Sequence, residues 1–153
     1  MSQLQEKPCE DVKQLNRELI MEAQEKMLGI PEEDKLELPV QNHFAKDIYG
    51  RELFMPAGSM IMGKIHKHSS LNILAQGTII LVTEDGRREI SAPYTVASQP
   101  GIKRMIYALT DATWITVHGT DETDVEKIEE KFIAKDYSEV EYLDGGEEQK
   151  CLG

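Results

Sequence analysis

Apolar and polar residues alternate along the middle of the chain, from about residue 40 to residue 120. The apolar segments in this region are short, and they are separated by turn sequences such as "YGRE", "PAGS", "EDGR" and "QPGI". A period of two is typical of half-buried strands, and short strands at this spacing favour a sandwich or barrel over βαβ units. The pattern therefore predicts an all-β core at 40–120.

Two turns in this core have sequences that predict their geometry. Asp85-Gly86 lies between "TIILVT" and "REISA". We expect it to form a two-residue hairpin turn in which both central residues have positive φ. Pro100-Gly101 predicts a type II turn, because proline fixes its own φ and glycine accepts the positive φ that follows.

The period changes to that of a helix before the core. Residues 1–39 are expected to be a helix followed by a charged linker, with Gly29 and Pro31 ending the helix. Its apolar stripe recurs at three- and four-residue steps and consists of Val12, Leu15, Leu19, Ala23 and Met27. We favour docking of this stripe on a sheet or on a second subunit.

A second helix is expected after the core, at residues 121–137. Thr123 and Glu126 have the spacing of a capping box, and Val125, Ile128 and Phe132 form one apolar face. Residues 138–153 are acidic and contain glycine, so we expect a flexible tail there.

The charge of the chain limits its partners. Seventeen Lys and Arg against twenty-eight Asp and Glu give a net charge of −11. We therefore expect no nucleic-acid partner and no membrane partner, because both surfaces are polyanions. Lys64 with Lys67, and Arg87 with Arg88, are either local basic patches or solvated strand edges.

The two cysteines and the N-terminal sequence bear on location. Cys9 and Cys151 show neither a disulfide framework nor zinc-ligand spacing, which favours a reducing, intracellular setting. No apolar run approaches the roughly 20 residues that a membrane helix needs. The first residues do not resemble a signal peptide. Together these features predict a cytoplasmic protein.

The segment "SMIMGKIHKH" contains the main candidate for metal chemistry. Read as one strand, it places His66 and His68 on the same face, so both imidazoles aim at one point. Such a pair either binds a metal or makes ordinary hydrogen bonds. His118 shares a strand face with Trp114 and Thr116, whereas His43 is expected to be a surface residue.

These residues resemble the motifs of the cupin superfamily. The likeness covers about residues 40–120, and its matching residues are Gly63, His66, His68 and Gly77 for the first motif and Pro100 and Gly101 for the second. It implies a cupin-type jelly-roll β-barrel and, as is common in cupins, a homodimer. More narrowly, the chain resembles small uncharacterised cupin-like proteins of tailed bacteriophages, which implies a host-cell or virion setting.

The chain departs from the cupin pattern at two ligand positions. Ser70 or Asn72 stands where an acidic ligand belongs, and Lys103 and Arg104 stand where the second motif has its histidine. The resemblance then implies a site made of His66, His68 and His118. Three imidazoles suit Zn, Fe, Ni, Cu or Mn, so the expected cofactor is a divalent transition metal of unspecified identity. Asn72 is expected to add an amide oxygen or to orient a bound water.

Other residues are candidates for binding a small molecule. Trp114, Tyr107 and Tyr94 either line a ligand cavity or fill the core, and Arg104 either pairs with an anion inside the barrel or lies at a strand edge. Three functions stay open: metal-dependent small-molecule chemistry, non-catalytic binding of a small anion for sensing or sequestration, and a virion structural or accessory role.

Overall fold

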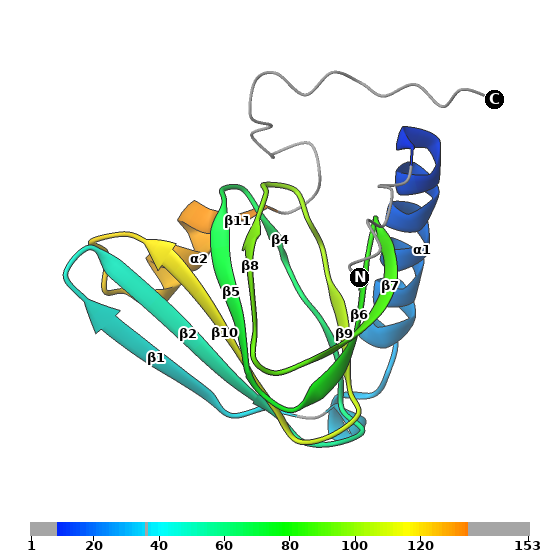
Figure 1. The fold of residues 1–153 in the computed structure, drawn as a ribbon, viewed down its shortest axis with the longest axis horizontal. Coiled ribbons are helices and arrows are strands. Elements are labelled where there is room, and N and C mark those ends of the chain that lie inside the picture. The colour runs from blue at the N-terminus through cyan, green and yellow to red at the C-terminus, as the bar shows by residue number, and fades with distance from the viewer. Residues whose placement is uncertain (1–8, 36, 135–153) are drawn as a thin grey trace.

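A computed structural model describes residues 9–35 and 37–134 of the chain (Figure 1). A long N-terminal helix precedes the strands, and a short helix follows them. In chain order the elements are α1 (Glu10–Leu28), η1 (Glu32–Asp34), β1 (Val40–Ala45), β2 (Ile48–Met55), β3 (Met60–Met62), β4 (Ile65–His66), β5 (Ser70–Gln76), β6 (Thr78–Thr83), β7 (Gly86–Ser91), β8 (Tyr94–Ser98), β9 (Met105–Ala108), β10 (Ala112–Gly119), α2 (Val125–Phe132) and β11 (Ile133–Ala134).

Two antiparallel sheets form the core, as Figure 1 shows. One has five strands in the order β1-β2-β10-β5-β8, and the other has four in the order β3-β9-β6-β7. A two-stranded ladder joins β11 to β4. Strands that are neighbours in space are often distant in sequence, as in a jelly roll. The expected all-β jelly-roll core with helical flanks is confirmed.

The inner faces of the strands follow the predicted period of two. On β10 the buried residues are Ala112, Trp114, Thr116 and His118, and the residues between them are half-buried or exposed. The expectation that His118 shares a face with Trp114 and Thr116 is therefore confirmed. Between the sheets lies one apolar cluster, made of Leu53, Met55, Leu74, Ile79, Leu81, Ile106, Ala108, Ala112 and Trp114.

Glycines occupy turns that no other residue fits well. Gly77 has a φ of +88°, and a Cβ at this position would lie 2.2 Å from the carbonyl oxygen of Asp111. Gly101 has the positive φ expected after Pro100. The β6–β7 hairpin also forms, but Thr83 pairs with Gly86. Its turn residues are thus Glu84 and Asp85, one position earlier than expected.

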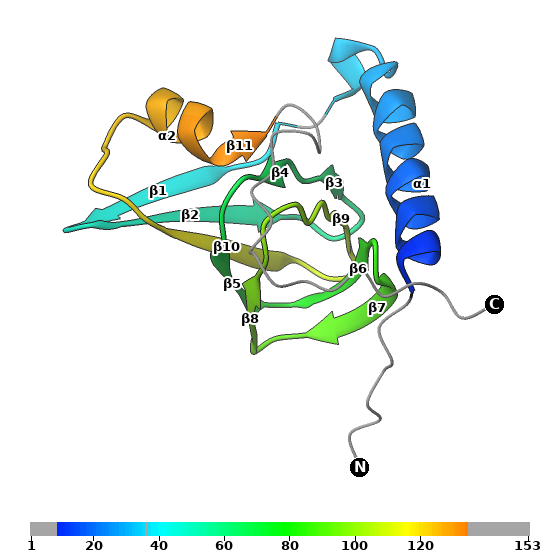
Figure 2. The same cartoon turned by 90° about the horizontal axis from the view of Figure 1, so that it is seen from above.

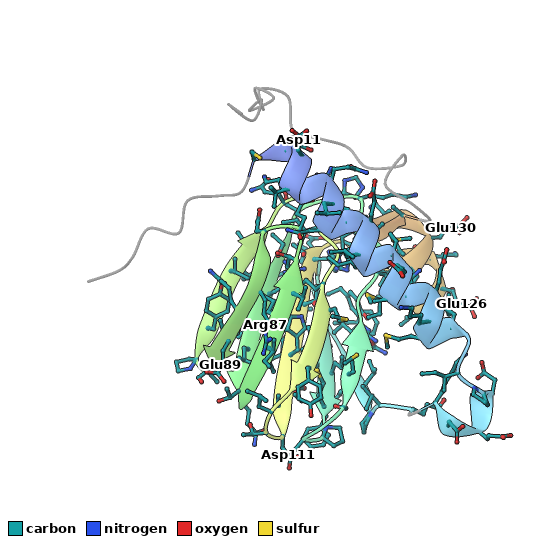
Figure 3. The ribbon with its side chains drawn as sticks, turned by 90° about the vertical axis from the view of Figure 1, so that its right-hand side faces the viewer. Asp11, Arg87, Glu89, Asp111, Glu126 and Glu130 are labelled. Atoms are coloured by element: carbon teal, nitrogen blue, oxygen red, sulfur yellow. The ribbon has the colours of Figure 1, made fainter. Side chains whose placement is uncertain are left out.

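Helix α1 packs outside the sheet that contains β6 and β7 (Figures 2 and 3). It ends at Leu28, as the Gly29 signal predicts. The docking face, however, is more polar than expected: Arg17 pairs with Glu84, and only Ile20 is fully buried. The predicted apolar stripe faces solvent at three of its positions, with exposed fractions of 45% at Val12, 55% at Leu15 and 54% at Leu19. Docking of that stripe on the sheet is therefore wrong, whereas its docking on a second subunit stays a prediction.

Two further observations concern the setting of the protein. Cys9, next to the start of α1, is disulfide-bonded, which weighs against the reducing setting inferred from the cysteine pattern. None of the helices among residues 9–35 and 37–134 is long and apolar enough to cross a membrane. The predicted tail at 138–153 lies outside the described residues.

Candidate functional site

The segment with His66 and His68 is interrupted, unlike the single strand expected from its sequence. β3 ends at Met62, β4 contains only Ile65–His66, and the chain bends at Lys67 and His68. At Gly63 the chain still pairs with the segment just before β9, since Gly63 N–H donates to the Arg104 carbonyl at 2.7 Å. A Cβ on Gly63 would lie 3.1 Å from that same oxygen. The strand parity that placed both histidines on one face is therefore lost.

A cavity of about 350 Å³ lies inside the barrel. Residues from both sheets and from α2 line it. Its polar and charged lining residues are Glu37, Tyr49, Arg51, Lys64, His66, Asn72, Arg104, Thr116, His118 and Glu129. Its apolar lining residues are Leu38, Val40, Leu53, Ile61, Met62, Ile106, Trp114, Ile128, Phe132 and Ile133, with Gly63 between them. A concave site that combines apolar walls with polar groups is typical of small-molecule binding.

Helix α2 covers one side of this cavity. Its cap is Asp124, whose carboxylate accepts the backbone N–H of Glu126, and not Thr123 as expected. Ile128 and Phe132 are buried and pack against Tyr49. Beyond the helix, β11 pairs with β4 so that Ile133 is opposite His66. Figure 2 shows β11 and β4 near each other beside α2. The C-terminal segment thus belongs to the site.

The structure stacks His66 on His118, whereas His68 lies near this pair but outside the cavity lining. The rings of His66 and His118 are stacked, with centroids 5.0 Å apart, and His118 also stacks on Phe132 at 4.6 Å. His68 contacts the edge of Phe132 at 5.6 Å and does not line the cavity. The Nδ1 atoms of His66 and His118 are buried without a hydrogen-bond partner among the described residues.

Both stacked histidines are neutral at pH 7. Burial lowers the pKa of His118 from 6.5 to about 4, and the charge of His68 adds to this effect. Burial also lowers the pKa of His66 to about 3, helped by the positive charges of His118, Arg104, Arg51 and Lys64. The charged groups that lower the pKa values of His66 and His118 are all cations, and no carboxylate is among them. The interior of the site is therefore electropositive.

The expected metal site does not fit these residues. Among residues 9–35 and 37–134, no three His, Cys, Asp or Glu side chains gather in a way that would hold a metal ion. His66 and His118 lie face to face, His68 is outside the cavity, and the potential around His66 is positive. A divalent cation needs several convergent ligands and benefits from negative charge, whereas the described cavity lining offers two imidazoles near Arg104, with its carboxylates at the exposed mouth.

Asn72 is buried in the barrel wall, and its side-chain amide is hydrogen-bonded at both ends there. It is 1% exposed, and its Oδ1 accepts the hydroxyl of Thr116 at 2.9 Å. Its Nδ2 donates to Ser98 at 2.6 Å and to Ser70 at 3.2 Å. These bonds link β5 to β8 and β10 inside the core. Asn72 lines the cavity as predicted, but both ends of its amide already have partners.

Arg104 is the half-buried cation that lines the cavity; the neighbouring Lys103 is buried but does not line it. Its Nη2 donates to the buried Ser98 hydroxyl, and its guanidinium lies 5.8 Å from the ring centroid of Trp114. No carboxylate pairs with it in the described part of the chain. Burial lowers the pKa of Arg104 to about 10, so it is still charged at pH 7. A half-buried guanidinium without a counterion is energetically costly, and a bound anion would lower that cost.

The other charges lie at the mouth of the cavity, where they balance. Arg51, Lys64, Glu37 and Glu129 all line the cavity and are all exposed. Lys64 and Glu129 form an ion pair at 3.5 Å. We call these four residues the rim. Because the rim has equal numbers of positive and negative groups, Arg104 sets the charge of the interior.

The remaining candidates lie outside the cavity. Tyr107 is on the face of β9 opposite Ile106, and only Ile106 lines the cavity. Tyr94 packs against the apolar core. His43, on β1, is exposed and contacts Glu52 at 2.8 Å, in keeping with a surface role. Trp114 is the one predicted aromatic residue that the structure places in the cavity wall.

Sequence reasoning did not identify several lining residues. Arg51 lies between Tyr49 and Leu53 on the inner face of β2, and a charge at an apolar position of an alternating strand was an available signal. For Ile128 and Phe132 the apolar helix face was visible, but nothing in the sequence indicated that this face closes the barrel.

Comparisons with known proteins find similar solved structures but no sequence match. No protein-family model and no curated protein sequence matches the chain. Among solved structures it is similar to an RmlC-like cupin family protein with a double-stranded β-helix fold from Methanocaldococcus jannaschii, with 14% identity over 60% of this chain and 88% of that chain and a TM-score of 0.47. It is similar to a cupin superfamily protein from Desulfitobacterium hafniense, with 9% identity over 60% and 84% of the two chains and a TM-score of 0.49.

A third similar structure is an acetylacetone dioxygenase from Acinetobacter johnsonii, with 15% identity over 59% of this chain and 65% of that chain and a TM-score of 0.46. At these values the likeness concerns the fold, and nothing about activity, ligand or metal passes from these proteins to this chain. In the arrangement of its strands, the chain is similar to cupin-type double-stranded β-helix proteins.

Proposed function

We propose that this protein binds a small organic anion inside its cupin-type barrel. The observation that supports the proposal is Arg104, a charged guanidinium in the cavity wall with no carboxylate partner among the described residues. Leaving such a charge without a counterion inside a protein is costly, and a bound carboxylate or phosphate removes that cost. The neutral histidines beside it do not compete for the anion.

A thermal-shift experiment tests this proposal. Wild-type protein is heated with acetate, benzoate, phosphate or ADP at constant ionic strength, beside Arg104→Met and the exposed control Arg87→Met. At least one anion is expected to raise the Tm of the wild type and of the control, because ligands that bind only the native state stabilise it. The same anion should leave the Tm of Arg104→Met unchanged.

The variant itself provides a second readout. Without ligand, Arg104→Met should be as stable as the wild type or more so, since an unpaired charge is replaced by an apolar side chain of similar length. Absence of a shift with all four anions, or an equal shift in Arg104→Met, would contradict the proposal.

Other functions expected from the sequence stay predictions. These are a metal at His66, His68 and His118 with associated small-molecule chemistry, a bacteriophage origin, a virion or accessory role, and a homodimer. The metal has the weakest structural support of these, because His68 lies outside the cavity.

A further inference from the structure

From the distribution of charge and apolar surface in the cavity, we infer that the ligand is a small monocarboxylate with an apolar, ring-sized body. This inference rests on the proposed function and narrows it to one chemical class. It places the carboxylate on Arg104 and the body against the apolar walls between the two sheets. The argument has three parts: the number of interior charges, the shape of the cation and the composition of the walls.

The number of interior charges favours one negative charge on the ligand. Arg104 is the only Lys or Arg among the lining residues that is not exposed. At the rim, Arg51 and Lys64 are balanced by Glu37 and Glu129, and Lys64 is already paired at 3.5 Å. A polyphosphate would bring several charges to a single guanidinium and would meet two carboxylates at the mouth. A monoanion matches the interior charge.

The shape of the cation favours a carboxylate. A guanidinium presents its N–H groups in a planar fork that matches the two oxygens of a carboxylate. The hydrogen bond found for Arg104 within the described residues uses Nη2 and goes to Ser98. That bond, together with the Trp114 ring beneath it, holds the fork in one orientation and leaves other N–H groups for a ligand.

The walls favour an apolar body of limited size. Leu53, Ile61, Ile106 and Trp114 line the cavity, and Ile128 and Phe132 close it. Asn72 offers little to a polar ligand because its amide is already bonded at both ends. The volume of about 350 Å³ is near the lower end of the range for small-molecule pockets, roughly 300–1,000 Å³. The unpartnered Nδ1 atoms of His66 and His118 can each take one hydrogen bond. A sugar acid or a nucleotide has more polar groups than these and would leave several of them unpaired against the apolar walls.

Isothermal titration calorimetry of the full chain with matched probes tests the inference. Benzoate has the charge and the ring, benzamide has the ring without the charge, and acetate has the charge without the ring. Inorganic phosphate and ADP represent the rival anions. Benzoate is expected to bind at least about tenfold more tightly than each of the other four probes, since every tenfold corresponds to about 1.4 kcal/mol.

Two variants separate charge from shape. Arg104→Met should abolish benzoate binding, and Arg104→Lys should weaken it about tenfold or more, because lysine keeps the charge but loses the fork. Arg87→Met is the matched surface control and should bind as the wild type does.

The outcomes distinguish this inference from the proposed function. Tighter binding of phosphate or ADP than of benzoate would overturn the inference that the ligand is a monocarboxylate. It would leave the proposal of an anion site intact. Equal affinity for acetate and benzoate would overturn only the inference that the ligand has an apolar, ring-sized body. Binding of benzamide as tight as that of benzoate, or no binding by any probe, would overturn both.

Discussion

His118 illustrates how the environment of one residue changes its chemistry. Its ring is 5% exposed and is stacked between those of His66 and Phe132. A charged imidazole there would lose its hydration and face a second histidine, so both rings stay neutral. Two neutral histidines beside Arg104 keep the cavity free of additional charge at pH 7, which suits a monoanion.

This neutrality predicts a pH dependence of stability. The unfolded chain binds protons near pH 6.5, whereas folded His118 does so only near its pKa of about 4. Between these values the unfolded state holds more protons, so the free energy of unfolding falls as the pH falls from about 6.5 to about 5. His118 alone should contribute a slope approaching roughly 1 kcal/mol per pH unit.

Urea denaturation at several pH values between 7 and 5 measures this slope. The variant His118→Gln should be less sensitive to pH in that range than the wild type. An unchanged slope in His118→Gln would show that the ring titrates normally in the folded protein.

Helix α2 connects the stability of the fold to the closure of the cavity. Its eight residues contain two that are buried, Ile128 and Phe132, and both pack against Tyr49 on β2. The segment is also attached through its backbone, since Lys67 N–H donates to the Phe132 carbonyl at 2.7 Å. An amphipathic helix this short is not stable alone, so it depends on these contacts.

Phe132→Ala is therefore expected to be costly. Removing a buried phenylalanine typically lowers the free energy of unfolding by about 3–5 kcal/mol. We expect a loss of about 3 kcal/mol, because a helix of eight residues can shift into the space that is vacated. Chemical denaturation measures it.

The matched control is Glu130→Ala on the exposed face of the same helix (Figure 3). A surface change of this kind should alter the free energy of unfolding by less than about 0.5 kcal/mol. If the two variants lost equal stability, the packing of α2 over the cavity would be wrong.

At the scale of elements, local patterns were good predictors wherever one face of an element is buried. The alternation along β10 predicted its inner face correctly, because a strand in a sandwich repeats every two residues. The same rule failed at Gly63 and Lys67, where the chain leaves the sheet. The predicted docking face of α1 on the sheet was wrong for another reason. Arg17 and Glu84 form an ion pair across the interface, and an apolar stripe in the sequence does not reveal such a contact.

At the scale of the whole molecule, the sequence predicted the fold better than the site. Turns and alternation are local, so the jelly roll could be inferred from them. The site is assembled from residues distant in sequence, such as Arg51 on β2, Arg104 before β9 and Phe132 on α2. The motif resemblance supplied three histidines, but whether they converge depends on a bend that the motif does not encode.

The net charge of −11 has a consequence for the metal question. An acidic surface attracts divalent cations weakly and without specificity, so some metal will accompany the protein at low salt. A specific site differs because its metal resists salt and dilution. Among the described residues, two adjacent imidazoles line the electropositive cavity. The metal site predicted from the sequence can therefore be tested against surface binding alone, which this geometry favours.

Elemental analysis after washing in about 0.5 M salt decides the matter, since the Debye length is then only a few ångströms. Wild-type protein and the double variant His66→Ala/His68→Ala should both contain well under one metal per chain, and their contents should be equal. Adding Zn²⁺ should raise the Tm of the two proteins by the same small amount, because binding to surface carboxylates is unaffected by the substitutions. One metal per chain in the wild type that is absent from the double variant would restore the three-histidine site and require His68 to turn toward the cavity.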